Sequence, residues 1–196
     1  MAHTLTDEQE EVLRMHAEAL ASFGRRVRAV GANQWSAPTP CSEWTVRDLV
    51  NHLTVEQLWV PPLMEGATLE EVGDRFAGDR LGDDPAAAWR HAATAAREAF
   101  TRHGALDRTV RLSSGATPAV KYCSQLAMDA AVHTWDLARA TGGDTRLAPE
   151  LVGFARREVE PYADQLPASG FFGGPVKVSD DADEQTKLLA LLGRNA

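Results

Sequence analysis

Residues 122–140 read YCSQLAMDAAVHTWDLARA, and their apolar side chains recur at the spacing of one amphipathic helix. Asp129 and His133 stand on the face that this spacing predicts to be buried. A carboxylate there must be paired, hydrogen-bonded or bound to a cation, because burial of an isolated carboxylate costs several kcal/mol. The two residues lie about one helical turn apart, so an oxygen and an imidazole nitrogen can converge on one divalent ion. The alternative is an Asp–His pair that is hydrogen-bonded in the core.

Three further segments before this stretch carry the signals of amphipathic helices. Their starts are marked by the capping pairs Thr6/Gln9 and Thr45/Asp48 and by the pair Asp84/Pro85. Pro61 and Pro62 are expected to end the second of these helices. The sequence of residues 64–84 indicates a long loop with one or two short helical turns. That of residues 106–118 indicates a short extended connection.

The helix that begins after Thr45 carries His52 among leucines on its apolar face. Four helices of this length predict a bundle in which that helix faces residues 122–140, so His52 would lie near Asp129 and His133. Two imidazoles and one carboxylate form a three-ligand site that keeps a position for water or substrate, as catalytic zinc sites do. The same donors suit nickel, iron and manganese; zinc is the expected ion.

The predicted fold class is all-α, with a helical bundle over residues 1–145. Residues 146–196 are predicted to form a C-terminal helical extension packed on the same domain, in which Pro149 opens a fifth helix and an acidic run precedes a last one. His16 lies on the apolar stripe of the first helix. We expect a hydrogen-bonded core histidine there, and the alternative is a fourth metal ligand.

The composition bounds the class of protein and its partners. With 196 residues, of which 44% are hydrophobic and 24% charged, the chain suits one soluble domain that needs no disulfide or structural metal. A net charge of −8 without a basic stripe disfavours nucleic acid and anionic membranes. No apolar run has membrane length and no secretory signal is present, so we expect a cytoplasmic protein. Cys41 and Cys123 are expected to be reduced core or edge thiols.

Two separated segments together resemble one known family. Residues 39–53, TPCSEWTVRDLVNHL, and residues 128–142, MDAAVHTWDLARATG, are similar to the mycothiol-dependent maleylpyruvate isomerase group of the DinB-like metal-binding superfamily. The resemblance implies a DinB-like four-helix bundle and a divalent metal ion held by His52, Asp129 and His133. The isomerase pattern has glutamate at the position of Asp129, so the shorter carboxylate must be brought closer to the ion by its helix.

The resemblance also implies an activity, that of a metal-dependent thiol transferase or isomerase. Its partners would be mycothiol, or a similar low-molecular-weight thiol, and a small electrophile, because a metal-coordinated thiol is deprotonated and becomes a nucleophile. Glu56 and Asp136 are the candidate catalytic residues, which would orient a ligand imidazole or move a proton. For Asp136 the alternative is a salt bridge to Arg139 or a carboxylate on the helix surface.

Two other interpretations remain open at this point. One is a non-catalytic metal- or ligand-binding helical bundle with the same ligands. The other is a bundle whose His and Asp side chains are only paired with each other in the core. Members of this superfamily often pair, which leaves a homodimer open.

Overall fold

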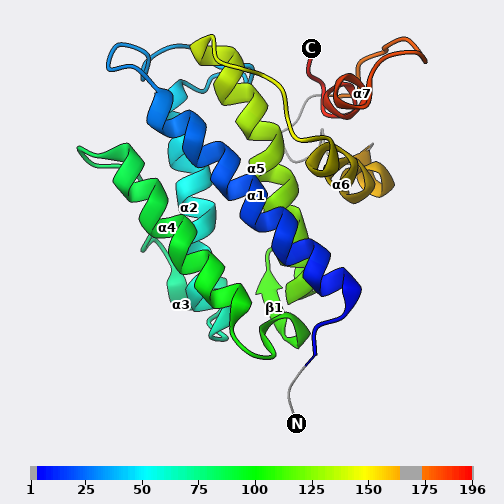
Figure 1. The fold of residues 1–196 in the computed structure, drawn as a ribbon. Coiled ribbons are helices and arrows are strands. Elements are labelled where there is room, and N and C mark those ends of the chain that lie inside the picture. The colour runs from blue at the N-terminus through cyan, green and yellow to red at the C-terminus, as the bar shows by residue number, and fades with distance from the viewer. Residues whose placement is uncertain (1–3, 164–173, 196) are drawn as a thin grey trace.

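Helices make up nearly all of the regular structure (Figure 1). The computed structural model describes residues 4–163 and 174–195. Its helices are α1 Asp7–Ala29, α2 Val46–Met64, α3 Leu69–Val72, α4 Pro85–Thr101, α5 Ala119–Thr141, α6 Pro149–Val159 and α7 Glu184–Leu191, with a 3-10 turn at Ala105–Asp107. Strands β1, Thr109–Leu112, and β2, Gly115–Pro118, form one antiparallel hairpin. The predicted all-α fold class is therefore confirmed.

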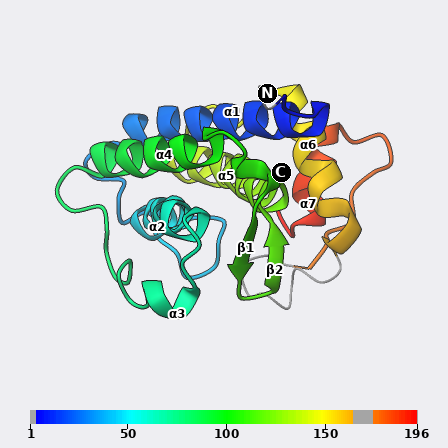
Figure 2. The same ribbon diagram turned by 90° about the horizontal axis from the view of Figure 1, so that it is seen from below.

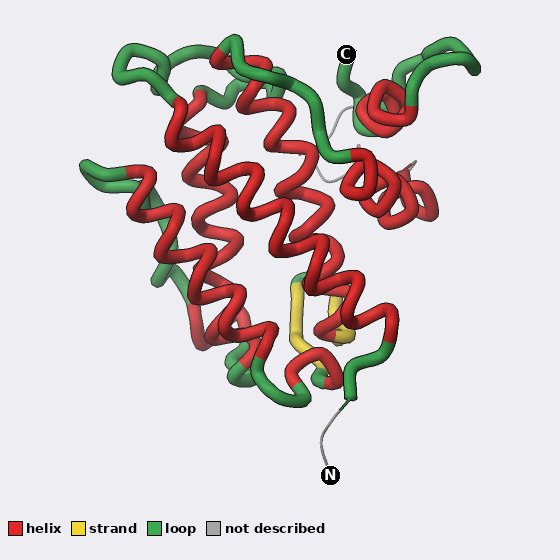
Figure 3. The backbone as a smooth tube through the Cα atoms, viewed as in Figure 1, coloured by secondary structure: helices red, strands yellow, loops and turns green. Residues whose placement is uncertain are grey.

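Four long helices form the bundle. α1 packs mainly along α5 and α2 mainly along α4, while α2 and α5 also contact each other (Figure 3). The interior is filled by apolar side chains from all four helices, among them Phe23, Leu53, Phe100 and Leu137, which solvent hardly reaches. Each such side chain contributes about 1.5–3 kcal/mol through its removal from water. This packing fixes the facing sides of α2 and α5 relative to each other.

The helices begin where the capping signals predict. Capping boxes at Thr6 and Thr45 precede α1 and α2, and the side chain of Asp84 accepts a hydrogen bond at the start of α4. Each cap satisfies a backbone N–H group that no helical carbonyl can reach. By fixing where α2 begins, Thr45 also determines which face of the helix each later side chain occupies, including that of His52.

The prediction that Pro61 and Pro62 end the second helix is wrong, because α2 continues to Met64. Both prolines lie in its last turn, where each lacks the N–H group for a helical hydrogen bond. The loss is offset by the burial of Leu63 and Met64, whose side chains are 2% and 3% exposed. The carbonyl groups of both prolines also accept hydrogen bonds from the backbone N–H of Glu65, at 3.0 and 3.2 Å.

Three smaller parts pack around the bundle. The region between α2 and α4 is a loop that contains the single turn α3, as predicted, and Figure 2 shows α3 and the β1–β2 hairpin on the same side of the bundle. α6 packs against α5 and α1, and α7 packs against α6. In the part of the chain that the structure describes, no helix has the length and apolar character needed to cross a membrane.

His16 is a buried core histidine, as expected. Its Nε2 lies 3.3 Å from Oε1 of Gln57 on α2, and its ring meets the edge of Phe100 at a centroid distance of 5.2 Å. Burial lowers the pKa of His16 to about 3, and the charge of Arg97 acts in the same direction. The folded protein therefore keeps this imidazole neutral at pH values where an unfolded chain would protonate it.

This difference predicts a loss of stability in mild acid. The unfolded chain binds a proton at His16 near the ordinary pKa of 6.5, whereas the folded protein binds it only near 3, so the free energy of unfolding falls as the pH drops between these values. Between pH 7 and pH 5 the loss is about 2 kcal/mol. Urea unfolding at each pH measures this loss. In the variant His16→Gln the free energy of unfolding should lack this part of its pH dependence, whereas in His91→Gln, at an exposed position, it should keep it. The same pH dependence in the wild type and both variants would contradict the assignment of this loss to His16.

Candidate metal centre

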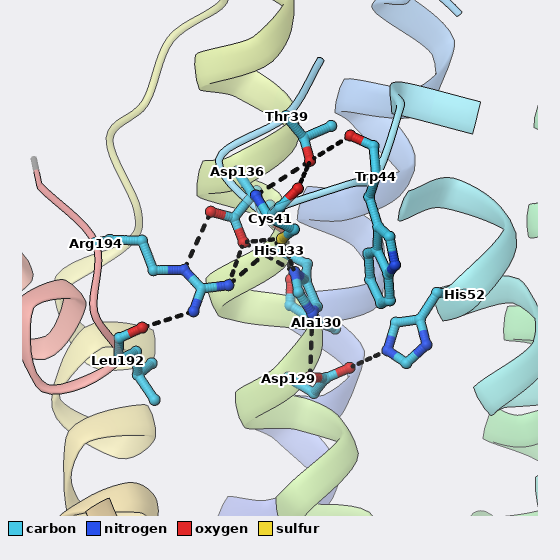
Figure 4. A network of polar contacts seen from close by, with 11 residues as sticks. Thr39, Cys41, Trp44, His52, Asp129, Ala130, His133, Asp136, Leu192 and Arg194 are labelled. Carbon is cyan, nitrogen blue, oxygen red and sulfur yellow. Dashed lines mark hydrogen bonds and ion pairs between the residues drawn. The ribbon is translucent and has the colours of Figure 1, made fainter. Parts of the chain in front are cut away.

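Three side chains of metal-ligand types converge where α2 and α5 face each other. Asp129 lies between the two histidines (Figure 4): its Oδ2 is 3.5 Å from Nε2 of His52, and its Oδ1 is 3.3 Å from Nε2 of His133. One ligand atom from each residue lies within 4.8 Å of those of the other two. Asp129 and His133 come from successive turns of α5 and His52 from α2, so the structure brings together the three residues predicted as ligands.

The spacing of these atoms fits a small divalent ion. Nitrogen and oxygen ligands at about 2.0–2.2 Å from a tetrahedral zinc ion lie roughly 3.3–3.5 Å from each other. The two observed separations, 3.3 and 3.5 Å, fall in that range, and each is measured from a different oxygen of Asp129. The shorter Asp side chain therefore reaches both imidazoles. Three protein ligands leave one tetrahedral position for water or a substrate atom.

The charges around His133 favour a cation between it and Asp129. Burial alone lowers the pKa of His133, but the charge of Asp129 and hydrogen bonds to Asp129 and Asp136 outweigh burial and raise it. Burial alone raises the pKa of Asp129, but the charge of His133 and hydrogen bonds to His133 and His52 lower it. A positive charge, either a proton or a metal ion, is stabilised at this point.

Asp136 holds the far side of the His133 ring. Its Oδ2 lies 2.8 Å from Nδ1 of His133, and both side chains are completely buried. An Nδ1–H that donates to this carboxylate leaves the Nε2 lone pair directed toward Asp129. Asp136 is therefore placed to orient a ligand imidazole, which is one of the two roles predicted for it.

The basic partner of Asp136 is Arg194, so the alternative of a salt bridge to Arg139 is wrong. Arg194 follows α7 and donates to both oxygens of Asp136, at 2.9 and 3.3 Å, and to the carbonyl of Leu192 at 2.7 Å (Figure 4). Its side chain is only 5% exposed. The C-terminal extension thus contributes a buried charge to the surroundings of the candidate metal ligand His133.

The loop before α2 contacts both candidate histidine ligands, through Cys41 at His133 and through Trp44 at His52. Sγ of Cys41 lies 3.7 Å from Nδ1 of His133, 3.4 Å from Asp136 and 3.5 Å from Nη2 of Arg194. The Trp44 ring lies over His52 at a centroid distance of 4.8 Å. Cys41, His133 and Asp136 form a second cluster of ligand types. The guanidinium of Arg194 already supplies a cation to this cluster, so a second metal ion there would be repelled.

Glu56 lies one turn after His52 and faces a cavity of about 460 Å³ next to the centre. The cavity lies among α2, α3, α5 and the hairpin. Its lining residues are His52, Glu56, Trp59, Leu63, Leu69, Leu112, Ser113, Tyr122, Gln125, Leu126, Met128, Asp129 and Tyr162. Burial raises the pKa of Glu56, and the charge of Asp129 adds to this, while His52 and His133 act against it. The candidate ligands His52 and Asp129 therefore line a mostly apolar cavity that is partly open to solvent.

Sequence reasoning missed three residues of this centre. Cys41 and Trp44 lie in the segment that resembles the isomerase group, only a few residues before His52, and that proximity was the available signal. Arg194 had no signal, because only the fold brings it to Asp136. Cys41 and Cys123 are free, buried thiols, as expected, and burial raises the pKa of Cys123.

Comparisons with known proteins place the chain in one family. Residues 16–138 match the family model described as the mycothiol maleylpyruvate isomerase N-terminal domain. Two relatives from Mycobacterium tuberculosis, the uncharacterized proteins Rv0738 of strain ATCC 25618 / H37Rv and MT0763 of strain CDC 1551 / Oshkosh, are each 34% identical over 172 residues. The similarity covers 79% of this chain and 87% of each relative.

Solved structures with the same fold carry a related name. They are crystal structures of the mycothiol-dependent maleylpyruvate isomerase and of a histidine-to-alanine mutant of it, with TM-scores of 0.64 and 0.63. The likeness covers 80% of this chain and 72% of each structure, at 16% and 14% sequence identity. At such identity the likeness concerns the fold, and it confirms the predicted DinB-like bundle.

Proposed function

Because the chain belongs to the mycothiol maleylpyruvate isomerase N-terminal domain family, we propose that it is a metal-dependent thiol transferase or isomerase acting on a small electrophile. The proposal includes zinc as the ion and mycothiol, or a similar low-molecular-weight thiol, as the second reactant. The observation that carries it is the convergence of His52, Asp129 and His133 at the edge of an apolar cavity.

In this proposal the three residues hold the ion and leave one position for the thiol sulfur. A bound divalent ion would supply a positive charge that favours the deprotonated form of a coordinated thiol. The cavity walls beside His52 and Asp129 would exclude water, which strengthens the attraction between charges inside the site.

Asp136 and Glu56 take separate roles. Asp136 lies behind His133, away from the cavity, and acts as a positioning residue through the Nδ1–H group. Glu56 faces the cavity, and its raised pKa lets the carboxyl group hold a proton closer to neutral pH. When the thiolate sulfur bonds to one carbon of an electrophilic double bond, the π electrons move to the next carbon, and Glu56 would give that carbon its proton.

Cobalt substitution tests whether a thiol reaches the ion. Mycothiol titrated into the cobalt-loaded protein is expected to produce a sulfur-to-metal charge-transfer band with one thiol per protein, because one coordination position is left open. Conjugation of mycothiol to a panel of small electrophiles, followed as loss of free thiol, then tests for catalysis.

The outcomes separate the competing interpretations. A band without catalysis of any conjugation would favour the non-catalytic metal-binding bundle. No bound metal after purification and reconstitution would favour side chains that are only paired in the core. The proposed activity stands only if both the band and a rate above the uncatalysed reaction are observed.

A further inference from the structure

The walls of the cavity beside the candidate metal centre are apolar. Its apolar lining residues include Trp59 and Leu63 from α2, Leu69 from α3, Leu112 from β1 and Leu126 from α5. No lysine or arginine is among the lining residues that the structure describes. A group that enters this space is therefore removed from water without a basic side chain to pair with it.

Two basic residues that directly neighbour lining residues in the sequence, Lys121 and Arg111, are directed elsewhere. Lys121 forms an ion pair with Glu158 and lies 5.2 Å from the ring centre of Tyr162. Arg111 is exposed, and it points to the opposite face of β1 from Leu112, because successive side chains of a strand alternate. Neither cation faces the cavity, and that of Lys121 is already neutralised.

Among the residues that the structure describes, the charges of the site do not balance an anionic substrate. A divalent ion would be balanced by the Asp129 carboxylate together with one coordinated thiolate. The Glu56 carboxyl group adds a negative charge when it is ionised and no charge when it is protonated. A carboxylate carried by the electrophile would then be a buried charge without a partner, which strongly disfavours binding.

Polar groups that suit a neutral oxygen atom are present. The Gln125 amide, the Ser113 hydroxyl and the Tyr122 phenol all line the cavity. An amide or hydroxyl group can donate a hydrogen bond to a carbonyl or ester oxygen, and such a bond places one end of an otherwise apolar molecule. The lining therefore favours uncharged ligands over anionic ones. Its polar side chains can bind one polar end of an otherwise apolar ligand.

We propose that the electrophile taken by this cavity is an uncharged, largely apolar compound with a double bond conjugated to a carbonyl group, and that dicarboxylates are excluded. The proposal rests on the thiol-transfer function proposed above. The thiolate sulfur bonds to the carbon distant from the carbonyl group, the π electrons move to the carbon next to the carbonyl group, and that carbon takes one proton.

A matched pair of electrophiles tests the proposal. Diethyl maleate and maleate share one double bond and differ in charge. With zinc-loaded protein and mycothiol, the rate enhancement over the uncatalysed reaction is expected to be about a hundredfold larger for the diester. An equal or larger enhancement for maleate would overturn the proposed ligand class while leaving the thiol-transfer function intact.

Binding of unreactive analogues separates this inference from the activity. Diethyl succinate and succinate lack the double bond, so calorimetric titration measures their binding without any reaction. The diester is expected to bind and the dianion is not. If no electrophile is conjugated, the thiol-transfer function fails, but binding of diethyl succinate and succinate still tests the proposed ligand class. Equal affinity for succinate and its diester would overturn that class.

Two neighbouring serines provide a charge test. Ser113 lines the cavity, and Ser114, the next residue of the hairpin turn, does not. In Ser113→Arg a cation at the wall should lower the preference for diethyl succinate over succinate about tenfold. In Ser114→Arg the preference should stay as in the wild type. Equal preferences in the two variants would show that the cavity wall does not select by charge, contrary to the proposal.

Discussion

The variant His52→Ala is expected to lose the bound metal ion and remain folded. His52 supplies the one candidate ligand from α2, so its removal leaves two ligands on α5 and a second empty position. Zinc affinity should fall more than about a hundredfold, beyond the range seen when only a residue that orients a ligand is changed. The His52 side chain is 19% exposed, so the free energy of unfolding of the metal-free protein should change by only about 1 kcal/mol.

Elemental analysis and competition with a zinc-binding dye measure this effect. The matched control is His91→Ala on α4, which removes an exposed histidine and should leave zinc content unchanged. Charge-transfer absorption of the cobalt form with mycothiol should disappear in His52→Ala and persist in His91→Ala. Equal metal content in wild type, His52→Ala and His133→Ala would refute the three-ligand site.

The second large effect is expected at Arg194. The variant Arg194→Met leaves the carboxylate of Asp136 buried without its cation, and breaking a buried pair in this way costs about 3–5 kcal/mol of stability. The same change frees Asp136 to move relative to His133. Zinc affinity should therefore fall about 10–100-fold, although Arg194 lies outside the proposed ligand set.

A double variant separates stability from positioning. Asp136→Leu combined with Arg194→Met removes both charges, so most of the lost free energy of unfolding should return. Zinc affinity should stay low, because no carboxylate orients the His133 ring. Recovery of zinc affinity together with stability would show that Asp136 has only a structural role.

Local patterns predicted the helices and the positions of Asp129 and His133 on the buried side of α5. Caps at Thr6 and Thr45 and the apolar period of residues 122–140 depend on neighbours in the chain, and such short-range features can be read from sequence. The convergence of His52 with Asp129 and His133 followed from placing two amphipathic helices face to face. This placement needs only the apolar periodicity of each helix and the assumption that the helices form a bundle.

The errors came from contacts that the local pattern does not contain. Pro61 and Pro62 did not stop α2, because the burial of Leu63 and Met64 outweighs the missing hydrogen bonds. Arg194 is separated from Asp136 by the end of α5, by α6 and by α7, so no spacing rule links the two. Ion pairs of this kind depend on how the extension folds back on the bundle.

The pairing of the helices has a consequence for motion. Since α5 packs mainly on α1 and α2 mainly on α4, the bundle consists of two helix pairs, and the proposed ligands come from both. An ion held between them would act as a cross-link. Amide hydrogen exchange along α2 should then slow when zinc is added and speed up when a chelator withdraws it, with a smaller change along α1.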